Sequence, residues 1–489
     1  MSPRLVCLPR RAPSGKFAAW NRNLSGSLSR RLDLGMANRK KTNRKSDNKN
    51  HQKSGGQKPA PQTEPRQPFH VGAFLKALGP GLITGASDDD PSGIGTYSQA
   101  GAQLGYGIGW TMLLTFPLMT AIQEISARVG RVTGHGIAGN VCRHYSVLLL
   151  NVVVTLLFIA NTINIAADLG AMADATKLLI GGPGMIYVVA FGVTSVVAQI
   201  FLDYKRYVLV LKWLTLSLFA YVGALAFAHI SWRQALAGVL VPRLTWSADY
   251  FTTIVAIFGT TISPYLFFWQ ASQEAEDQRV DATKHPLIER QYGAQQEFHR
   301  IRADTVVGMA FSNLIALSII VTAAATLHAA GKTDIQTSAQ AAEALRPIAG
   351  TFAEVIFALG IVGTGLLAIP VLAGATAYAV GEGRKWPVGL ARKPKEAVAF
   401  YAVLALSAAI GIALNFTSIN PISALYWSAV VNGVLAVPVM VLLMIMSRRP
   451  EVMGRFVIGG PLYWLGWLST AAMLLSVVAM AVGIFLGKS

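Results

Sequence analysis

Apolar residues fill blocks of about twenty positions along most of the chain, and short polar segments separate these blocks. A helix of about that length crosses the roughly 30 Å hydrocarbon core of a bilayer. The pattern therefore predicts an all-α polytopic membrane protein with about eleven transmembrane helices. The predicted spans are residues 73–104, 108–128, 147–179, 184–203, 207–230, 250–273, 304–328, 351–380, 397–414, 421–446 and 461–486.

Composition agrees with a membrane protein, and the distribution of charge separates off one end of the chain. Charged residues make up 13% of the sequence, against about 25% in soluble domains. Residues 1–70 hold 16 Lys and Arg against 3 Asp and Glu, so most of the net charge of +18 lies there. This segment is polar and poor in aromatic residues, which disfavours folding. We predict a disordered basic cytoplasmic tail over 1–70 and a transmembrane domain over 71–489, and no nucleic-acid partner.

The charges of the loops indicate the orientation in the membrane. Loops after even-numbered spans carry basic residues, such as Lys205 with Arg206 and Arg448 with Arg449. The opposite loops are short or nearly neutral, and the longer loop at 231–249 has two arginines but no cluster. Because basic loops stay on the cytoplasmic side, we expect a multi-pass protein with its N-terminus in the cytoplasm.

Two spans contain helix-breaking residues in their middle. The first has three consecutive aspartates followed by Pro91, Ser92 and Gly93, and the sixth contains Gly259 and Pro264. Breaks at corresponding places predict two five-helix halves related by inverted symmetry, in which unwound backbone coordinates a cation at mid-membrane. We expect Pro91, Gly93, Gly259 and Pro264 to mark the breaks.

The aspartates of the first break are candidate metal ligands. An ionised carboxylate inside a membrane costs at least about 2.5–3.5 kcal/mol, and three neighbours cannot share one helical face. Pro91 disfavours helical backbone at Asp90, so Asp90 is the first candidate ligand and Asp89 the second. Alternatively, Asp88 or Asp89 caps the second half-helix or faces a water-filled vestibule.

The sixth span adds only oxygen ligands. Its candidates are the Thr260 carbonyl and the hydroxyl or carbonyl of Ser263. Oxygen-only sites suit magnesium, calcium and manganese, whereas sulfur and imidazole select softer metals. Neither break contains Met, Cys or His, and the two cysteines, Cys7 and Cys142, provide no disulfide framework. The sequence predicts a hard-cation site.

Residues 79–102 and 126–134 resemble the corresponding motifs of the NRAMP family of divalent metal transporters. The resemblance covers about residues 72–486 and includes the eleven spans and the broken sixth span. It implies a LeuT-like fold, alternating access and location in a bacterial inner membrane. It also implies that the metal is the transported substrate, that no cofactor is permanently bound, and that the lipid bilayer is the only obligatory partner.

The sequence departs from the family at several ligand positions. The family motif Asp-Pro-Gly-Asn reads Asp90-Pro91-Ser92-Gly93 here. The Asp ligand therefore carries over to Asp90, whereas the Asn ligand falls on Gly93, which has no side chain. Gly93 stays in the candidate metal site by its position only. In the sixth span the backbone carbonyl carries over to Thr260. The Met of the family falls on Ser263, and the following His on Tyr265.

Other polar positions of the family are mostly replaced. A third-span Asp carries over to Asp168, whereas two Glu fall on Asn161 and Ala171, and a tenth-span Gln falls on Ala436. Asp168 is thus the remaining candidate for a proton relay, or else it has a structural hydrogen-bonding role. We expect weak or absent proton coupling.

These departures favour one branch of the family. Without the Met, magnesium should be tolerated, and the smaller Gly and Ser should leave room for water that magnesium sheds reluctantly. The sequence therefore resembles the NRAMP-related magnesium transporters. We predict a secondary transporter, not an enzyme, that moves Mg²⁺ and/or Mn²⁺.

Other functions remain open at this stage. One is a proton-coupled Mn²⁺/Fe²⁺ transporter of the ordinary NRAMP type. A sodium-coupled carrier of an organic solute is less favoured, because three aspartates would repel a carboxylate. A membrane aspartyl protease would need Asp90 opposite Asp168, but the protease signature is absent around Asp168. A non-transporting metal sensor is the last alternative. The sequence contains no nucleotide-binding Gly-rich loop followed by Lys-Ser/Thr, so ATP-driven pumping is disfavoured.

Overall fold

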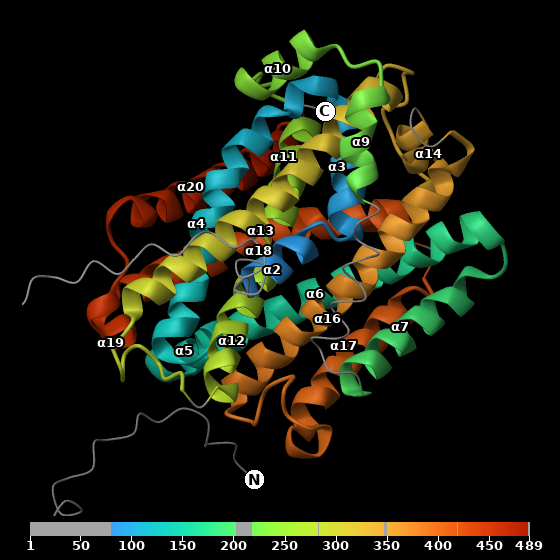
Figure 1. Ribbon diagram of the computed structural model, residues 1–489. Coiled ribbons are helices and arrows are strands. Elements are labelled where there is room, and N and C mark those ends of the chain that lie inside the picture. Colours follow the sequence, from blue (N-terminus) through green and yellow to red (C-terminus); the bar gives the residue numbers. More distant parts are fainter. Residues whose placement is uncertain (1–79, 202–217, 282, 347–349, 418, 488–489) are drawn as a thin grey trace, which may run out of the picture. The chain divides into compact units, whose positions relative to one another are not determined.

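The computed structural model describes residues 80–201, 218–281, 283–346, 350–417 and 419–487 (Figure 1). Within these ranges the chain forms helices and no β-strand, which confirms the predicted fold class. The predicted tail, residues 1–70, lies outside the described residues.

The helices follow the predicted spans closely. Those of the first half are α2 (Pro80–Asp88), α3 (Pro91–Leu104), α4 (Trp110–Thr133), α5 (Ile137–His144), α6 (Val147–Ile180), α7 (Gly184–Phe201) and α9 (Phe219–Phe227). Those of the second half are α10 (Trp232–Leu240), α11 (Ala248–Thr261), α12 (Pro264–Val280), α13 (Ala294–Ala323), α16 (Ala353–Arg384), α17 (Val398–Leu414), α18 (Pro421–Arg448) and α20 (Gly460–Phe485). Short turns complete the chain: η1 (Gly105–Ile108), the π-helical η3 (Ala324–His328), α14 (Ser338–Ala342), η4 (Glu343–Leu345), η5 (Gly350–Phe352), η6 (Pro394–Glu396), α19 (Pro450–Met453) and η7 (Gly454–Phe456).

Length and apolarity alone identify fewer spans than eleven. Seven helical stretches within the described ranges are long and apolar enough to cross a membrane, and there are eight if the bent pair 91–108 and 110–133 counts as one span. The other predicted spans correspond to shorter or interrupted helices. For example, α17 has only 17 residues, and residues 207–217 of the fifth predicted span lie outside the described ranges.

The two interrupted helices lie against each other. In the first half the chain breaks between α2 and α3, and in the second between α11 and α12. Helix α2 contacts α12, and α3 contacts α11, while α13 packs along both α2 and α3. Helix α18 covers α3 and α11, and α6 packs on α16, α17 and α18. The two breaks are thus surrounded by packed helices (Figure 1).

Glycines allow the broken helices to approach their neighbours. A Cβ atom added at Gly85 of α2 would lie 2.2 Å from the Gly308 carbonyl oxygen of α13. One added at Gly259 of α11 would lie 2.0 Å from the Ala429 carbonyl oxygen of α18. Small residues at such contacts are typical of helix packing in membranes. Gly259 lies in the last turn of α11, where it permits this contact.

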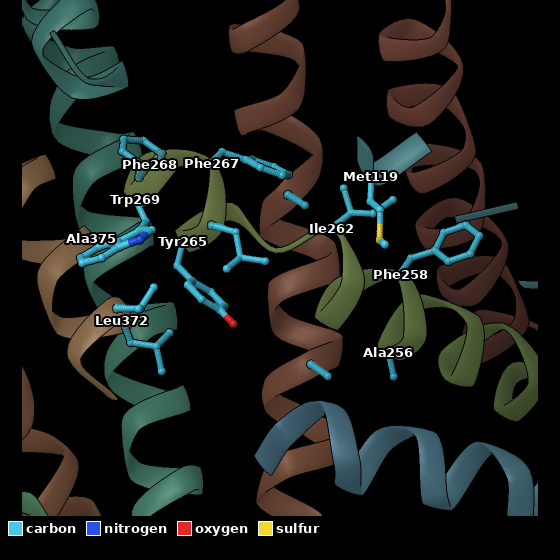
Figure 2. Packing of buried hydrophobic residues seen from close by; sticks show 14 of the residues in the cluster. Met119, Ala256, Phe258, Ile262, Tyr265, Phe267, Phe268, Trp269, Leu372 and Ala375 are labelled. Carbon is cyan, nitrogen blue, oxygen red and sulfur yellow. The ribbon is translucent and has the colours of Figure 1, made fainter. Parts of the chain in front are cut away.

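Large side chains pack around the second break. Phe258 precedes it, Ile262 lies within it and Trp269 follows it, and all three are at most 1% exposed. In Figure 2, Trp269 and Ala375 lie at one side of the cluster and Phe258 and Met119 at the other, with Tyr265 and Ile262 between them in this view. The break is therefore held in a close-packed apolar environment, in which any polar atom needs a partner.

Candidate metal site

The break in the first span is built around Asp90. Helix α2 ends at Asp88, and Pro91 is the first residue of α3. Proline is common at the first position of a helix, because the backbone N–H that it lacks would have no helical partner there. Asp90 is the N-cap, and its Oδ1 accepts hydrogen bonds from the Gly93 amide at 2.7 Å and the Ser92 hydroxyl at 2.6 Å. A capping carboxylate fits the positive end of the helix dipole.

The break in the second span consists of Ile262 and Ser263. The Ser263 hydroxyl donates to the carbonyl oxygens of Gly259 at 2.5 Å and Thr260 at 2.9 Å. These carbonyls belong to the last turn of α11, which has no helical partners for them. Pro264 begins α12. Thr260 and Ser263 are both buried, at 2% and 1% exposure.

Tyr265 joins the two breaks. Its hydroxyl lies 3.2 Å from Asp90 Oδ2 and 3.1 Å from the Ser87 carbonyl oxygen. From the sequence, Tyr265 is only the residue on which a family histidine falls. The structure instead brings the phenol into contact with the principal ligand candidate. The sequence signal that could have indicated this role is the position of Tyr265 directly after Pro264, in the first turn of α12 beside the break.

Gly93 lies between the two broken helices. A Cβ atom there would stand 3.1 Å from the Asp88 carbonyl oxygen, 3.2 Å from Thr260 Oγ1 and 3.3 Å from the Tyr97 ring. Gly93 is in the first turn of α3, one turn after the break. The space that a family asparagine would use is already bordered on three sides, so Gly93 itself does not open room for water.

Asp88 and Asp89 are directed to α13, away from the cap. The Ser312 hydroxyl lies 2.5 Å from Asp88 Oδ2 and 3.3 Å from Asp89 Oδ1. The remaining oxygens, Asp88 Oδ1 and Asp89 Oδ2, are buried without a hydrogen-bond partner in the described part of the chain. Ser312 gave no sequence signal, since a serine in an apolar helix is common.

Asp168 on α6 brings a fourth carboxylate to the breaks. It is fully buried, and it lies close enough to Asp90 for the two carboxylates to interact electrostatically. The Ser92 amide is nearby, but neither Asp168 oxygen forms a hydrogen bond of standard geometry with any described residue. Asn161, one of the replaced family positions, instead donates to the Leu372 carbonyl and to Thr376 of α16.

The chemistry of this centre is that of oxygen atoms. Asp90, Thr260 and Ser263 contribute a carboxylate, a carbonyl and a hydroxyl, and Tyr265 another hydroxyl. No three His, Cys, Asp or Glu side chains among the described residues converge as a preformed metal cage. The four aspartates have no Lys, Arg or His among their contacts in the described ranges. The arrangement thus offers oxygen atoms, the kind of ligand that hard cations prefer.

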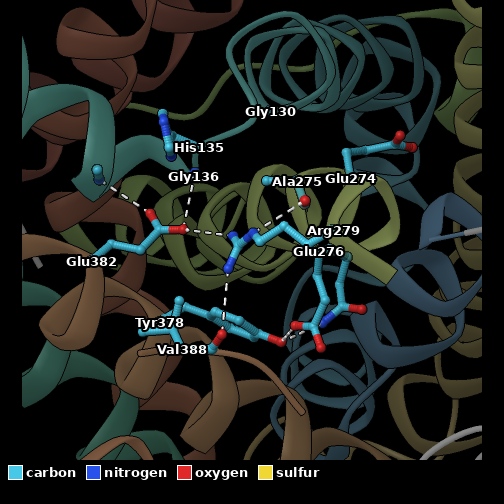
Figure 3. A network of polar contacts seen from close by, with 12 residues as sticks. Gly130, His135, Gly136, Glu274, Ala275, Glu276, Arg279, Tyr378, Glu382 and Val388 are labelled. Atoms are coloured by element: carbon cyan, nitrogen blue, oxygen red, sulfur yellow. Dashed lines mark hydrogen bonds and ion pairs between the residues drawn. The ribbon is translucent and has the colours of Figure 1, made fainter. Parts of the chain in front are cut away.

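Polar contacts connect α5, α12 and α16 at the end of the molecule that carries the basic loops. Glu382 of α16 accepts hydrogen bonds from the amides of Gly136 and Gly139, both at 3.1 Å, and pairs with Arg279 of α12 at 3.5 Å (Figure 3). The Tyr378 hydroxyl donates to Glu276, as Figure 3 also shows. These contacts, called the inner network here, tie α12 to α16 and α5.

The opposite side has a cavity and a second set of contacts. The cavity, of about 480 Å³, is lined by residues of α3, α11 and α18, including Gln99, Gln103 and Asp249. Thr253 Oγ1 lies 3.1 Å from Gln103 Oε1 and 2.9 Å from the Tyr426 hydroxyl. Thr253 is about two helical turns from Thr260. The four aspartates themselves are at most 1% exposed, so the centre is occluded on both sides.

Paired helix breaks that meet at buried oxygen atoms are typical of LeuT-like membrane proteins. The chain belongs to the Nramp family, because the family model described as "Natural resistance-associated macrophage protein-like" matches residues 81–483. This match confirms the resemblance found in the sequence.

Individual relatives agree with the family. The chain is 26% identical over 412 residues to a protein named "Divalent metal cation transporter MntH" from Granulibacter bethesdensis, covering 82% of this chain and 86% of that protein. A protein of the same name from Acidiphilium cryptum is 27% identical over 402 residues, covering 78% and 84%. In structure, the chain is similar to a manganese transporter from Eremococcus coleocola with a TM-score of 0.63 at 16% identity, covering 86% of this chain and 90% of that one. This similarity confirms the LeuT-like fold.

Proposed function

We propose that the protein is a secondary transporter that moves Mg²⁺ and/or Mn²⁺ across the cell membrane by alternating access, with weak or no proton coupling. The proposal rests mainly on the four buried carboxylates that have no basic partner among the described residues. Uncompensated charge inside a membrane is costly, so a cation stabilises this centre. The names of the relatives, "Divalent metal cation transporter", support the same class and a transporter rather than an enzyme.

Each residue of the centre has a distinct role in this proposal. Asp90 supplies the charged ligand, and Thr260 and Ser263 supply the carbonyl and hydroxyl oxygens that the second break exposes. Tyr265 orients Asp90 through its hydroxyl. Oxygen-only coordination suits hard cations such as Mg²⁺ and Mn²⁺. Alternating access then consists of opening either the inner network or the contacts around Thr253.

The proposed setting is the inner membrane of a bacterium, with the basic loops and the N-terminus in the cytoplasm. The inner network then faces the cytoplasm, and the cavity of about 480 Å³ faces the outside. No permanently bound cofactor and no protein partner are needed for this mechanism.

Uptake of ions into proteoliposomes tests the proposal. We expect both Mn²⁺ and Mg²⁺ to enter, and Asp90→Ala to reduce uptake to the level of protein-free liposomes. Asp90→Asn keeps the side-chain volume and should have the same effect, because the charge is lost. Glu289→Gln, at an exposed glutamate, is the control and should transport normally. If Mn²⁺ enters while excess Mg²⁺ neither enters nor competes, the assignment of a hard, hydrated site is wrong.

A second candidate is a proton-coupled Mn²⁺/Fe²⁺ transporter of the ordinary Nramp type. The observation in its favour is Asp168, a buried carboxylate with two unpartnered oxygens near Asp90. A pH-sensitive dye inside the liposomes separates the two candidates. If metal uptake acidifies the liposomes and this acidification disappears in Asp168→Asn, the transporter is proton-coupled and the proposal of weak or no coupling is wrong. A sodium-coupled organic-solute carrier is disfavoured by the four aspartates.

A further inference from the structure

A large cavity lies at the end of the helices opposite the basic loops. Its volume is about 1180 Å³, and it is lined by residues of α10, η1 and η3 and of the segment before α11. All of these segments follow odd-numbered spans, so they belong to the face where basic residues are rare. The cavity shares no residue with the candidate metal site. The proposed metal transport gives it no role.

The cavity is cationic. Arg233, Arg243, His229 and His328 line it, and none of its lining residues, all within the described ranges, carries a carboxylate. Neither arginine forms an ion pair with a described residue. These are the two arginines of the loop at 231–249. Guanidinium groups bind phosphate oxygens through paired hydrogen bonds, so the cavity is suited to a phosphate-bearing anion.

The neighbouring surface indicates the depth of the cavity in the bilayer. Trp232, Leu236 and Leu240 of α10 are 54%, 57% and 65% exposed. Their spacing of four residues places them on one face of the helix. A short helix with an exposed Trp and Leu stripe is typical of a helix lying in the membrane interface, where phospholipid headgroups are found. The cavity behind α10 is therefore at the level of lipid phosphates.

We infer that this cavity binds the headgroup phosphate of an anionic phospholipid from the outer leaflet. Arg233 and Arg243 hold the phosphate, and the acyl chains lie along the stripe of Trp232, Leu236 and Leu240. The cavity is larger than the roughly 300–1,000 Å³ of typical small-molecule pockets, so it has room for a whole headgroup, whereas a bare ion would leave most of it unfilled. The site is independent of metal transport.

Binding of short-chain lipids to the full-length protein in detergent tests this inference. The probes are dioctanoyl phosphatidylglycerol, the phosphatidylcholine with the same chains, and inorganic phosphate, followed by native mass spectrometry and thermal unfolding. We expect saturable binding of phosphatidylglycerol, with an affinity about tenfold or more lower in the Arg233→Gln/Arg243→Gln double variant. Phosphatidylcholine, whose choline cation the arginines repel, and inorganic phosphate, which has no acyl chains to lie along the stripe, should bind about tenfold or more weakly than phosphatidylglycerol.

The control is Arg346→Gln, which removes an exposed arginine from another loop after an odd-numbered span. It should bind phosphatidylglycerol like the original protein. Equal binding by the double variant would overturn the inference. So would arginine-dependent binding of inorganic phosphate without any preference for phosphatidylglycerol, because the site would then take a soluble anion. Metal uptake by the double variant should be unchanged.

Discussion

At the scale of single residues, the two oxygens of Asp90 have different neighbours. Oδ1 caps α3 by accepting hydrogen bonds from the Gly93 amide and the Ser92 hydroxyl, whereas the hydrogen-bond partner of Oδ2 among the described side chains is the Tyr265 hydroxyl. The capping contacts are local and belong to the helix. The contact with Tyr265 crosses from the first break to the second. Oδ2 is therefore the oxygen that we expect to face a metal ion, with the Tyr265 hydroxyl orienting it.

Removing the Tyr265 hydroxyl should weaken metal binding. In Tyr265→Phe the ring still packs, but Asp90 Oδ2 loses the group that orients it. A hydrogen bond to a charged acceptor contributes about 1.5–3 kcal/mol, so we expect the apparent KM for Mn²⁺ uptake to rise about tenfold. Tyr187→Phe, which removes a hydroxyl bonded to the Gly181 carbonyl, is the control. A lower KM would mean that the phenol competes with the metal instead.

Some of these residue roles were predictable and others were not. Pro91 and Pro264 each fix a helix start, so the places of Asp90 and Thr260 near the breaks follow from local sequence. The partners of the carboxylates come from distant positions: Ser312 lies 224 residues after Asp88, and Tyr265 lies 175 residues after Asp90. No local pattern encodes such contacts. Whether Asp90, Thr260 and Ser263 bind metal stays a prediction.

At the scale of helices, long apolar blocks predicted the spans because length and hydropathy are local properties. The short helices α5 and α10 were missed, since each is too short to form such a block. Helix α5 is nevertheless important for the inner network, in which its first amides bind Glu382 of α16. This contact connects a loop helix to a transmembrane helix.

Weakening that contact should loosen α5. Glu382→Gln removes the charge that pairs with Arg279 and weakens acceptance from the α5 amides. Cys142 on α5 is 4% exposed and lies against Gly383, so its thiol reports on this movement. In a Cys7→Ser background, we expect Glu382→Gln to increase the rate of maleimide labelling of Cys142 about tenfold, the factor that corresponds to one lost charged hydrogen bond.

The matched control is Glu343→Gln, which removes the carboxylate of an exposed ion pair with Lys332. Surface pairs contribute little, so labelling should not change. Unchanged labelling in Glu382→Gln as well would show that the inner network does not hold α5 in place.

At the scale of the whole molecule, the four buried carboxylates have no basic partner among the described residues, so burial leaves their ionised forms uncompensated. A cation that binds the folded state alone stabilises it by mass action. We expect Mg²⁺ at about 100 times its Kd to stabilise the protein by about 2.7 kcal/mol, seen as a rise in Tm. Sodium chloride at equal ionic strength should not reproduce this rise, and Asp90→Ala should abolish it. A rise that persists in Asp90→Ala would place the ion elsewhere.

The same aspartates affect how the protein is made. During synthesis the first span leaves the ribosome long before α12 and α13 exist, so Asp88, Asp89 and Asp90 have neither Tyr265 nor Ser312 beside them. At about 2.5–3.5 kcal/mol each, three aspartates outweigh much of the hydrophobicity of that span. Stable insertion of the first span therefore depends on helices translated later. The insertion machinery must keep the first span out of lipid until those helices arrive.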